Sequence, residues 1–260
     1  MSIGRASGRY IDPPRVNTIQ ATNVAAHREN RILTALPTSD RMQLFDVVSS
    51  VALPVKTVLF EPGDPIDAVY FPVDGVISLV TPFHDGAMVE VASVGNEGIV
   101  GVPLVPYGGL AVRAIAQVAG HCLRLDAGVF LEWSARSQAF QRLVERYTQA
   151  LFGQIAQAAA CNRLHSNDAR LARWLLLNED RVGSSQFMIT QDFLGQLLGV
   201  RRSTVCESAG ILQRDGAIRY SRGRVTIVDR QLLEMASCEC YATITSELER
   251  VVYGGLPESV

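Results

Sequence analysis

Two arginines and two hydroxyl residues, Arg201, Arg202, Ser203 and Thr204, follow one another shortly after Gly199. A guanidinium can donate two parallel hydrogen bonds to O6 and N7 of guanine, and hydroxyl groups suit phosphate oxygens. The four residues open a predicted helix, whose free N–H groups and dipole also attract phosphate. This combination predicts contact with the major groove of double-stranded DNA.

Two short helices and a hairpin must place these residues on an exposed helix end. Thr190 is suited to cap the first helix, and Gly199 supplies a tight turn after it. The second helix begins near Arg201 and ends before Gly216, and two short strands then flank the turn 221–223. This order predicts a winged helix-turn-helix.

The composition allows two ordinary domains with apolar cores, since the chain has 260 residues and an apolar fraction of 48%. The net charge of −2 does not by itself indicate nucleic-acid binding, but residues 167–231 hold ten arginines against seven acids. Lys56 is the only lysine in the sequence. A preference for arginine fits bidentate recognition of guanine or phosphate, and it equally fits a GC-rich genome.

The cellular compartment is predicted from signals that the sequence lacks. No secretory signal and no apolar run of membrane-spanning length occurs along it, and the five cysteines do not form a disulfide framework. We therefore expect a cytoplasmic protein without membrane contact.

The fold class expected from the pattern is α+β. Short runs rich in Val, Ile, Phe and Tyr occupy residues 51–125 at a spacing of about ten residues, with turn residues between them, which predicts an antiparallel, jelly-roll-like β-roll. A long dimerisation helix and the C-terminal winged helix-turn-helix follow. The expected units are a flexible arm at 1–27, the β-roll at 28–135, the dimerisation helix at 136–165, the DNA-binding domain at 166–240 and a helical extension with a tail at 241–260.

The long helix is expected from Gln138 to Leu164. Its apolar residues recur at spacings of four and three, which makes a heptad seam three heptads long. The seam favours a homodimeric coiled coil, and a helix packed on its own domain is the alternative. The residues expected at the dimer interface are Phe140, Val144, Tyr147, Leu151 and Ala158.

The succession of roll, long helix and winged helix resembles the Crp–Fnr superfamily of bacterial transcription regulators over about residues 30 to 240. The segments similar to its sensory roll are LFEPGD (59–64), YFPVDGVISL (70–79) and VGNEGIVG (94–101). Those similar to its DNA-binding domain are RLARWLL (170–176), GVRRSTV (199–205) and LQRDGAI (212–218). The resemblance implies a homodimer that binds a pseudo-palindromic operator, works with RNA polymerase and couples a signal to transcription.

The resemblance assigns DNA-contacting roles residue by residue. Arg202 takes the main base-reading position, with Ser203 and Thr204 in support, while Arg201 contacts DNA or forms a salt bridge to an acid such as Asp192. Glu207 stands where cyclic-AMP-responsive members have a second basic reader, so the operator need not be theirs. The residues expected to position the DNA backbone are Thr190, Gln191, Arg222 and Arg224.

An effector site is implied in the roll, where cyclic-nucleotide sensors of this family use a glutamate and an arginine. The residues that align with this site are Glu97, Gly98, Arg113 and Ala114. Three features argue against cyclic AMP: the extra loop PLVPYGGL before Arg113, the missing hydroxyl at Ala114, and the apolar pair Ile155 and Ala156 at the adenine positions. Arg113 could instead pair with an acid, because a buried guanidinium without an anion is costly. The alternatives are another small ligand, a second messenger or no effector.

Metal and redox cofactors are not predicted. The first cysteine is Cys122, so the N-terminal thiolates of an iron–sulfur sensor are missing, and the isolated histidines do not indicate haem. Cys161 and His165, four residues apart on a helix, could hold half a metal site. The thiols of Cys238 and Cys240 would point about 200° apart on a continuous helix, so no metal site is expected.

Two other functions remain as alternatives. An effector-binding or dimerising module without DNA recognition would fit the helix-weakening Gly210 and the unfavourable charge of Glu207. A cupin-like metal enzyme would need a histidine-rich metal set, which the sequence does not supply. The main expectation is a DNA-binding regulator without enzymatic activity.

Overall fold

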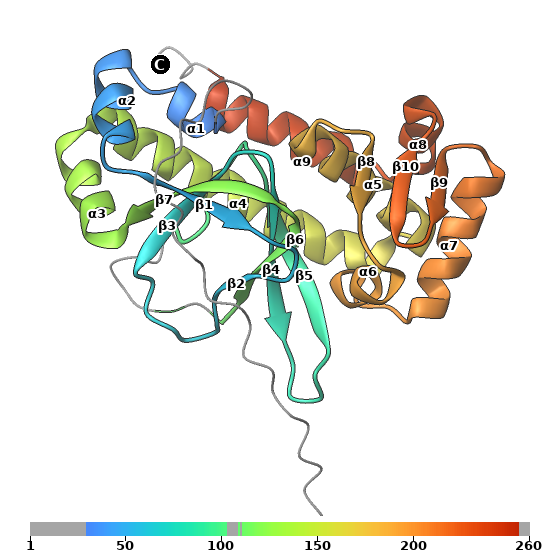
Figure 1. The fold of residues 1–260 in the computed structure, drawn as a ribbon. Helices are drawn as coiled ribbons and strands as arrows, with labels where there is room; N and C mark the ends of the chain where they lie inside the picture. The colour runs from blue at the N-terminus through green and yellow to red at the C-terminus, as the bar shows by residue number, and fades with distance from the viewer. Residues whose placement is uncertain (1–29, 103–108, 110, 255–260) are drawn as a thin grey trace, which may run out of the picture.

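The computed structural model describes residues 30–102, 109 and 111–254 (Figure 1). The expected N-terminal arm, most of the extra loop before Arg113 and the last six residues lie outside the described residues. Within them, a β-roll is followed by a long helix and a helical domain with a small sheet, so the predicted α+β class is confirmed.

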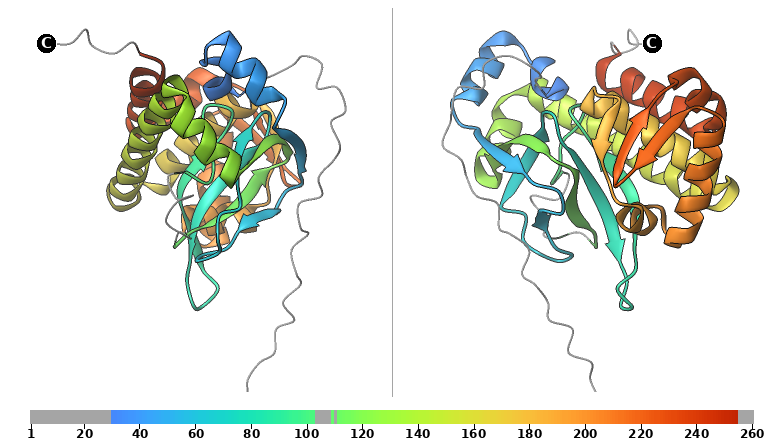
Figure 2. Two further views of the ribbon diagram at one scale, coloured as in Figure 1. Left: turned by 90° about the vertical axis from the view of Figure 1, so that its left-hand side faces the viewer. Right: turned by 45° about the vertical axis from the view of Figure 1, so that its right-hand side comes forward.

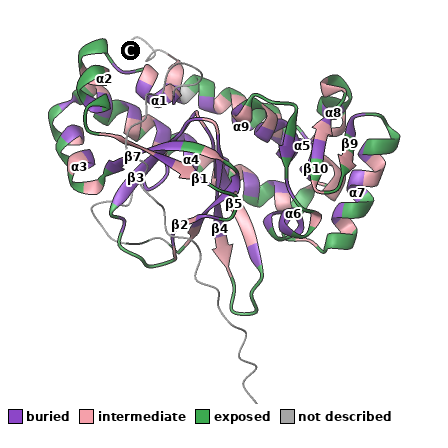
Figure 3. Cartoon of the chain, in the orientation of Figure 1, coloured by how far each residue is buried: buried purple, intermediate pink, exposed green. Residues whose placement is uncertain are grey.

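The roll consists of two antiparallel sheets, with strand orders β1-β7-β3 and β2-β6-β4-β5. Valine, isoleucine and aromatic side chains fill its interior, and every residue of β3 is buried (Figure 3). The strands are β1 (Ser49–Leu53), β2 (Val58–Phe60), β3 (Ala68–Pro72), β4 (Val76–Pro82), β5 (Met88–Val94), β6 (Arg113–Val118) and β7 (Gly120–Asp126).

Helices pack at one end of the roll and lead into the long helix. Asn30 caps the first of them by accepting from the N–H groups of Ile32 and Leu33. The second ends at Phe45, and Val47 and Val48 lie beyond it. These helices are α1 (Arg31–Thr34), α2 (Thr38–Phe45) and α3 (Ala127–Arg136).

The long helix α4 (Gln138–Leu164) has the predicted bounds, but its heptad seam is used inside the protomer. Phe140 is fully buried and packs edge-to-face on Phe130 and Trp133, with ring centroids 5.4 and 6.4 Å apart. The expected interface residues Tyr147, Leu151 and Ala158 are also buried by the protomer itself, and Val144 packs on the same core. These five residues therefore pack inside the protomer, and their assignment to a dimer interface stays a prediction.

The expected DNA-binding domain follows α4 and has one strand that the sequence pattern does not predict. Helix α5 ends at Val182, where Gly183 caps it in the left-handed conformation. The elements are α5 (Asn167–Val182), β8 (Gln186–Met188), α6 (Gln191–Leu198), α7 (Arg202–Arg214), β9 (Ile218–Ser221), β10 (Arg224–Ile227) and α8 (Arg230–Ala236). The strands form an antiparallel sheet in the order β8-β10-β9.

The C-terminal segment returns along α4 rather than leaving the domain. Helix α9 (Cys240–Leu248) and the π-helical turn η1 (Glu249–Tyr253) both contact α4, and their buried residues Leu248 and Val252 join the core of the roll. The chain leaves helical geometry at Ser237 and re-enters it at Cys240, so α8 and α9 are separate helices. Figures 1 and 2 show α9 lying beside α4 in each view.

A second apolar core joins the roll to the DNA-binding domain. Side chains of β4, β5 and β6, such as Val80 and Met88, pack with Trp174, Phe193 and Leu197 of the helical domain. The two domains are thus docked over a continuous apolar interface (Figure 2).

Truncation of Phe140 tests whether the apolar seam of α4 packs in the protomer core or lies at the surface. Phe140→Ala is expected to lower the free energy of unfolding by about 3–5 kcal/mol, because a buried aromatic ring is lost. The matched variant Leu164→Ala, on the same helix but 76% exposed, should change it by less than about 0.5 kcal/mol. Thermal denaturation followed by circular dichroism measures both, and equal effects would contradict the assignment of the seam to the protomer core.

Candidate nucleic-acid interface and interdomain network

The helix-turn-helix has the local contacts that its sequence predicts. The Thr190 hydroxyl caps α6 by accepting from the N–H of Phe193, and Gly199 turns the chain with a φ of 66°. The first residue after the turn, Val200, donates its N–H to Gly195 O, which holds α7 against α6. The absence of a Cβ on Gly195 permits this approach, since Val200 O would lie only 3.0 Å from it.

The N-terminus of α7 is open to solvent. Arg201 is its N-cap residue, and its side chain forms no capping hydrogen bond. The first backbone N–H groups of the helix are therefore not capped by this side chain. Arg201, Arg202 and Ser203 are exposed, and Thr204 is half-buried. Two arginines at an uncapped helix N-terminus combine formal charge with the helix dipole, which favours a polyanion at this end.

The other expected DNA contacts lie on neighbouring elements. Thr190 is exposed and Gln191 is half-buried at the start of α6, where Gln191 accepts a hydrogen bond from the Cys206 thiol of α7 at 2.8 Å. Arg222, at a φ of 49°, and Arg224 are exposed in the β9–β10 hairpin.

The salt bridge considered for Arg201 forms instead between Arg202 and Asp192. Their nearest charged atoms are 3.7 Å apart, and both side chains are mostly exposed. Such a pair is weak and leaves Arg202 able to turn toward another anion.

The expected effector residues each have a protein partner. Glu97 is buried and its Oε1 accepts from Arg181 Nε at 2.7 Å, whereas Arg113 donates to Glu61 at 2.8 Å. Ala114 is fully buried in β6, and a Cβ on Gly98 would collide with the Tyr147 hydroxyl. The pairing of Arg113 with an acid confirms the alternative considered for it.

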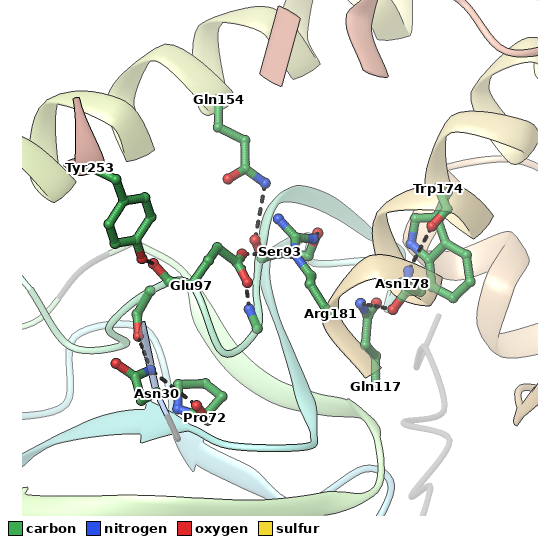
Figure 4. Close-up of polar contacts among 12 residues, drawn as sticks. Asn30, Pro72, Ser93, Glu97, Gln117, Gln154, Trp174, Asn178, Arg181 and Tyr253 are labelled. Carbon is green, nitrogen blue, oxygen red and sulfur yellow. Dashed lines mark hydrogen bonds and ion pairs between the residues drawn. The ribbon is translucent and has the colours of Figure 1, made fainter. Parts of the chain in front are cut away.

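Glu97 therefore belongs to a polar network between the roll and α5 (Figure 4). Arg181, in the last turn of α5, also donates to Ser93 Oγ of β5 at 2.5 Å, and Gln154 of α4 donates to Ser93 O. Gly95 allows this contact, since a Cβ there would lie 2.5 Å from Arg181 Cγ. Sequence patterns give no sign of the role of Arg181, because its partner lies 84 residues away in the chain.

A second set of buried hydrogen bonds also joins the roll to α5. Gln117 of β6 donates to Asn178 of α5 at 2.9 Å, and Asn178 donates to Trp174 O (Figure 4). Ser78 joins Gln117 to Glu90, and burial raises the pKa of the Glu90 carboxyl above its usual range. The interface thus combines apolar packing with polar groups that must be satisfied in pairs.

The C-terminal segment closes over the same network. The Tyr253 hydroxyl donates to Glu97 O (Figure 4). Arg31 pairs with Glu249 at 2.6 Å. A pocket of about 280 Å³ remains between α5, α9 and the roll, lined among others by Glu97 and Arg181. The second carboxylate oxygen of Glu97, Oε2, is buried and has no hydrogen-bond partner among the described residues.

Comparisons with known proteins agree with this architecture. Residues 50–137 match the model of the cyclic nucleotide-binding domain, and residues 169–236 match that of the Crp-like helix-turn-helix domain. A search of curated proteins gives no significant match. No helix in the described part of the chain has the length and apolar character needed to cross a membrane.

Solved structures share the fold at low sequence identity. FixK2 from Bradyrhizobium japonicum is 15% identical with a TM-score of 0.64, over 74% of this chain and 98% of that one. TTHB099, a CRP-family transcriptional regulator from Thermus thermophilus, is 19% identical with a TM-score of 0.60, over 72% and 95%. The c-di-GMP responsive global regulator CLP from Xanthomonas campestris is 16% identical with a TM-score of 0.59, over 74% and 100%.

A roll of the cyclic-nucleotide-binding type joined to a Crp-like helix-turn-helix defines a DNA-binding transcription regulator, not an enzyme. The chain belongs to the Crp–Fnr family of transcription regulators.

Removing the charge of Glu97 should loosen the docked domains. Glu97→Gln removes the carboxylate that pairs with the buried Arg181 guanidinium, which is expected to destabilise the folded chain by about 3–5 kcal/mol. Glu249→Gln removes the acid of an ion pair whose side chains are 40% and 54% exposed, and it should have a much smaller effect. The measurement is the shift of the thermal unfolding midpoint; a similar shift for both variants would contradict the structural importance of the buried pair.

Proposed function

We propose that this protein is a homodimeric regulator that binds a pseudo-palindromic DNA operator through α7 and its wing. The observation that carries the proposal is the exposed pair Arg201 and Arg202 at the uncapped N-terminus of α7. In this arrangement Arg202 reads a guanine, Ser203 and Thr204 support it, and Arg201 contacts the backbone or a neighbouring base. The residues that hold phosphates on either side are Thr190, Gln191, Arg222 and Arg224.

The regulator is proposed to act in the cytoplasm, where it meets the chromosome and RNA polymerase. Operator binding is coupled to a signal through the docked interface, because any rotation of α5 must break the contact between Arg181 and Glu97. Both expected effector anchors are occupied by protein partners, so a cyclic nucleotide at Glu97 and Arg113 is not supported. One structural neighbour responds to c-di-GMP, and a second messenger in the pocket beside Glu97 is a candidate effector here.

The DNA-binding part of the proposal is tested by footprinting and gel shift on DNA upstream of the protein's own gene. Arg202→Ala combined with Arg201→Ala should reduce specific affinity several hundred-fold, since each base contact contributes about 1–3 kcal/mol. Arg214→Ala, exposed at the other end of α7, is the matched control and should bind within a few-fold of wild type.

A footprint of the double variant equal to that of wild type would mean that α7 does not read DNA. An absence of footprints for wild type across genomic fragments at moderate salt would favour the alternative of a dimerising or effector-binding module without DNA recognition.

Dimerisation is proposed to use the face of α4 that neither the roll nor α9 covers. This outer stripe keeps the heptad spacing and consists of exposed side chains. Phe152 lies in its middle and is 73% exposed, and the small residues Ala156 and Ala159 allow close approach of a second helix. The stripe comprises Arg142, Glu145, Gln149, Phe152, Ala156, Ala159 and Arg163.

Placing a charge in the outer stripe should separate the protomers. Phe152→Glu is expected to convert a dimer into a monomer in sedimentation equilibrium, because two carboxylates would face each other across the symmetric interface. Phe83→Glu, on an exposed phenylalanine just after β4, is the control and should remain dimeric. A monomeric wild type, or a dimeric Phe152→Glu variant, would overturn the proposed interface.

A further inference from the structure

Four metal-binding side chains converge where α4 ends and the C-terminal segment returns to it. Cys161 lies in the last turn of α4, and His165 is the C-cap residue of the same helix. Cys238 and Cys240 come from the break between α8 and α9. The three sulfurs and one imidazole nitrogen all lie within 4.8 Å of one another.

The break between α8 and α9 explains why the sequence argument against this cluster fails. On a continuous helix the thiols of Cys238 and Cys240 would point apart. Cys238 instead lies in the short non-helical link before α9 begins, so both thiols turn toward α4. For this reason, the expectation that these two thiols cannot bind the same metal ion is wrong.

The spacing of the four groups fits a single tetrahedral ion. The Sγ atoms of Cys161 and Cys238 are 3.6 Å apart, and Cys240 Sγ lies 3.4 Å from His165 Nδ1. With metal–sulfur and metal–nitrogen bonds of about 2.3 and 2.0 Å, the edges of a tetrahedron are roughly 3.8 and 3.6 Å long. The ligands of an iron–sulfur cluster bind different iron atoms and must stand further apart, so the geometry favours one mononuclear ion.

The surroundings of the cluster are those of a structural metal site. All three cysteines are buried and pack with Ala169 in an apolar group of their own, which excludes water from the ligands. Nδ1 of His165 points to the cluster while its Nε2 meets Glu239 Oε1 at 3.2 Å, the carboxylate–histidine arrangement that orients metal-bound imidazoles. Gln157 donates to Cys240 Sγ at 2.9 Å, a hydrogen bond that supports a thiolate.

A positive charge that would balance such a site is buried beside it. Three thiolates, one neutral imidazole and a divalent ion together carry a net charge of −1. The guanidinium of Arg173 in α5 interacts electrostatically with Cys161 and Cys238, and its Nε has no hydrogen-bond partner among the described residues. A buried guanidinium needs a negative charge nearby, and an anionic cluster would supply it.

We propose that Cys161, His165, Cys238 and Cys240 bind one zinc ion. Three thiolates and one histidine form a closed tetrahedral ligand set with no position for substrate, which is the arrangement of structural zinc rather than of catalytic zinc. The ion fastens the α8–α9 junction to the end of α4. It thereby fixes the point at which α4 passes into the DNA-binding domain.

The test uses the full chain without a metal-affinity tag, purified in a reducing buffer that contains no chelator. Metal analysis by inductively coupled plasma mass spectrometry should give about one zinc per chain for wild type. Cys238→Ser and Cys240→Ser should each lower the zinc content at least about tenfold. Cys206→Ser, which removes an exposed thiol of α7 outside the cluster, should leave the content unchanged.

A second measurement avoids dependence on the folding of the variants. Wild-type protein is stripped with a chelator and titrated with Co²⁺, and tetrahedral thiolate coordination should give intense visible absorption that saturates at one equivalent and is displaced by Zn²⁺. Wild type without zinc that also fails to develop the cobalt spectrum would overturn the proposal. A Cys161–Cys238 disulfide in peptide maps of freshly purified protein would overturn it in favour of a redox pair.

Discussion

The buried ion pair between Arg181 and Glu97 constrains the arrangement of the whole molecule. Their side chains are only 5% and 8% exposed, so each charge compensates much of the desolvation of the other. Because one partner belongs to the last turn of α5 and the other to the loop after β5, the pair fixes the DNA-binding domain against the roll. Apolar side chains from both domains then fill the rest of the interface. The pair does not by itself make the chain stable, since desolvation offsets much of its attraction, but it specifies one docked position.

This constraint changes how a ligand could act on the roll. In the family's cyclic-nucleotide sensors the position of Glu97 holds a ribose, but here the same carboxylate holds the neighbouring domain. A ligand that competed for Glu97 or Arg181 would therefore act on the domain interface directly. The pocket beside this pair and the unpartnered Oε2 of Glu97 place such competition within reach of a small molecule with hydrogen-bond donors. The same side chains would then either bind the ligand or hold the two domains together.

The sequence predicts those parts of the structure that depend on local chemistry. Thr190 and Gly199 specify the two ends of α6 by themselves, and the bounds of α4 were predicted from its apolar spacing. In the structure, Ser137 caps α4 by accepting from the N–H of Phe140. The predictions that fail depend on contacts between residues far apart in the sequence. Heptad spacing shows that one face of α4 is apolar but not which surface covers it, and the roll rather than a second chain does so. The break after α8 has no local signal either, because serine and glutamate are tolerated in helices and only the packing of α9 on α4 makes the turn necessary.

The C-terminal segment limits how the DNA-binding domain can move. It leaves that domain at α8, passes the cysteine and histidine cluster, runs along α4 and ends against the roll through Tyr253 and Glu249. A rotation about the junction of α4 and α5 must therefore either carry α9 away from α4, exposing Leu248 and Val252, or turn around the cluster while α9 stays in place. The second motion exposes less apolar surface and so costs less free energy. The cluster lies beside this junction, at residues 161–165, which makes it the natural pivot for any change that separates α5 from the roll.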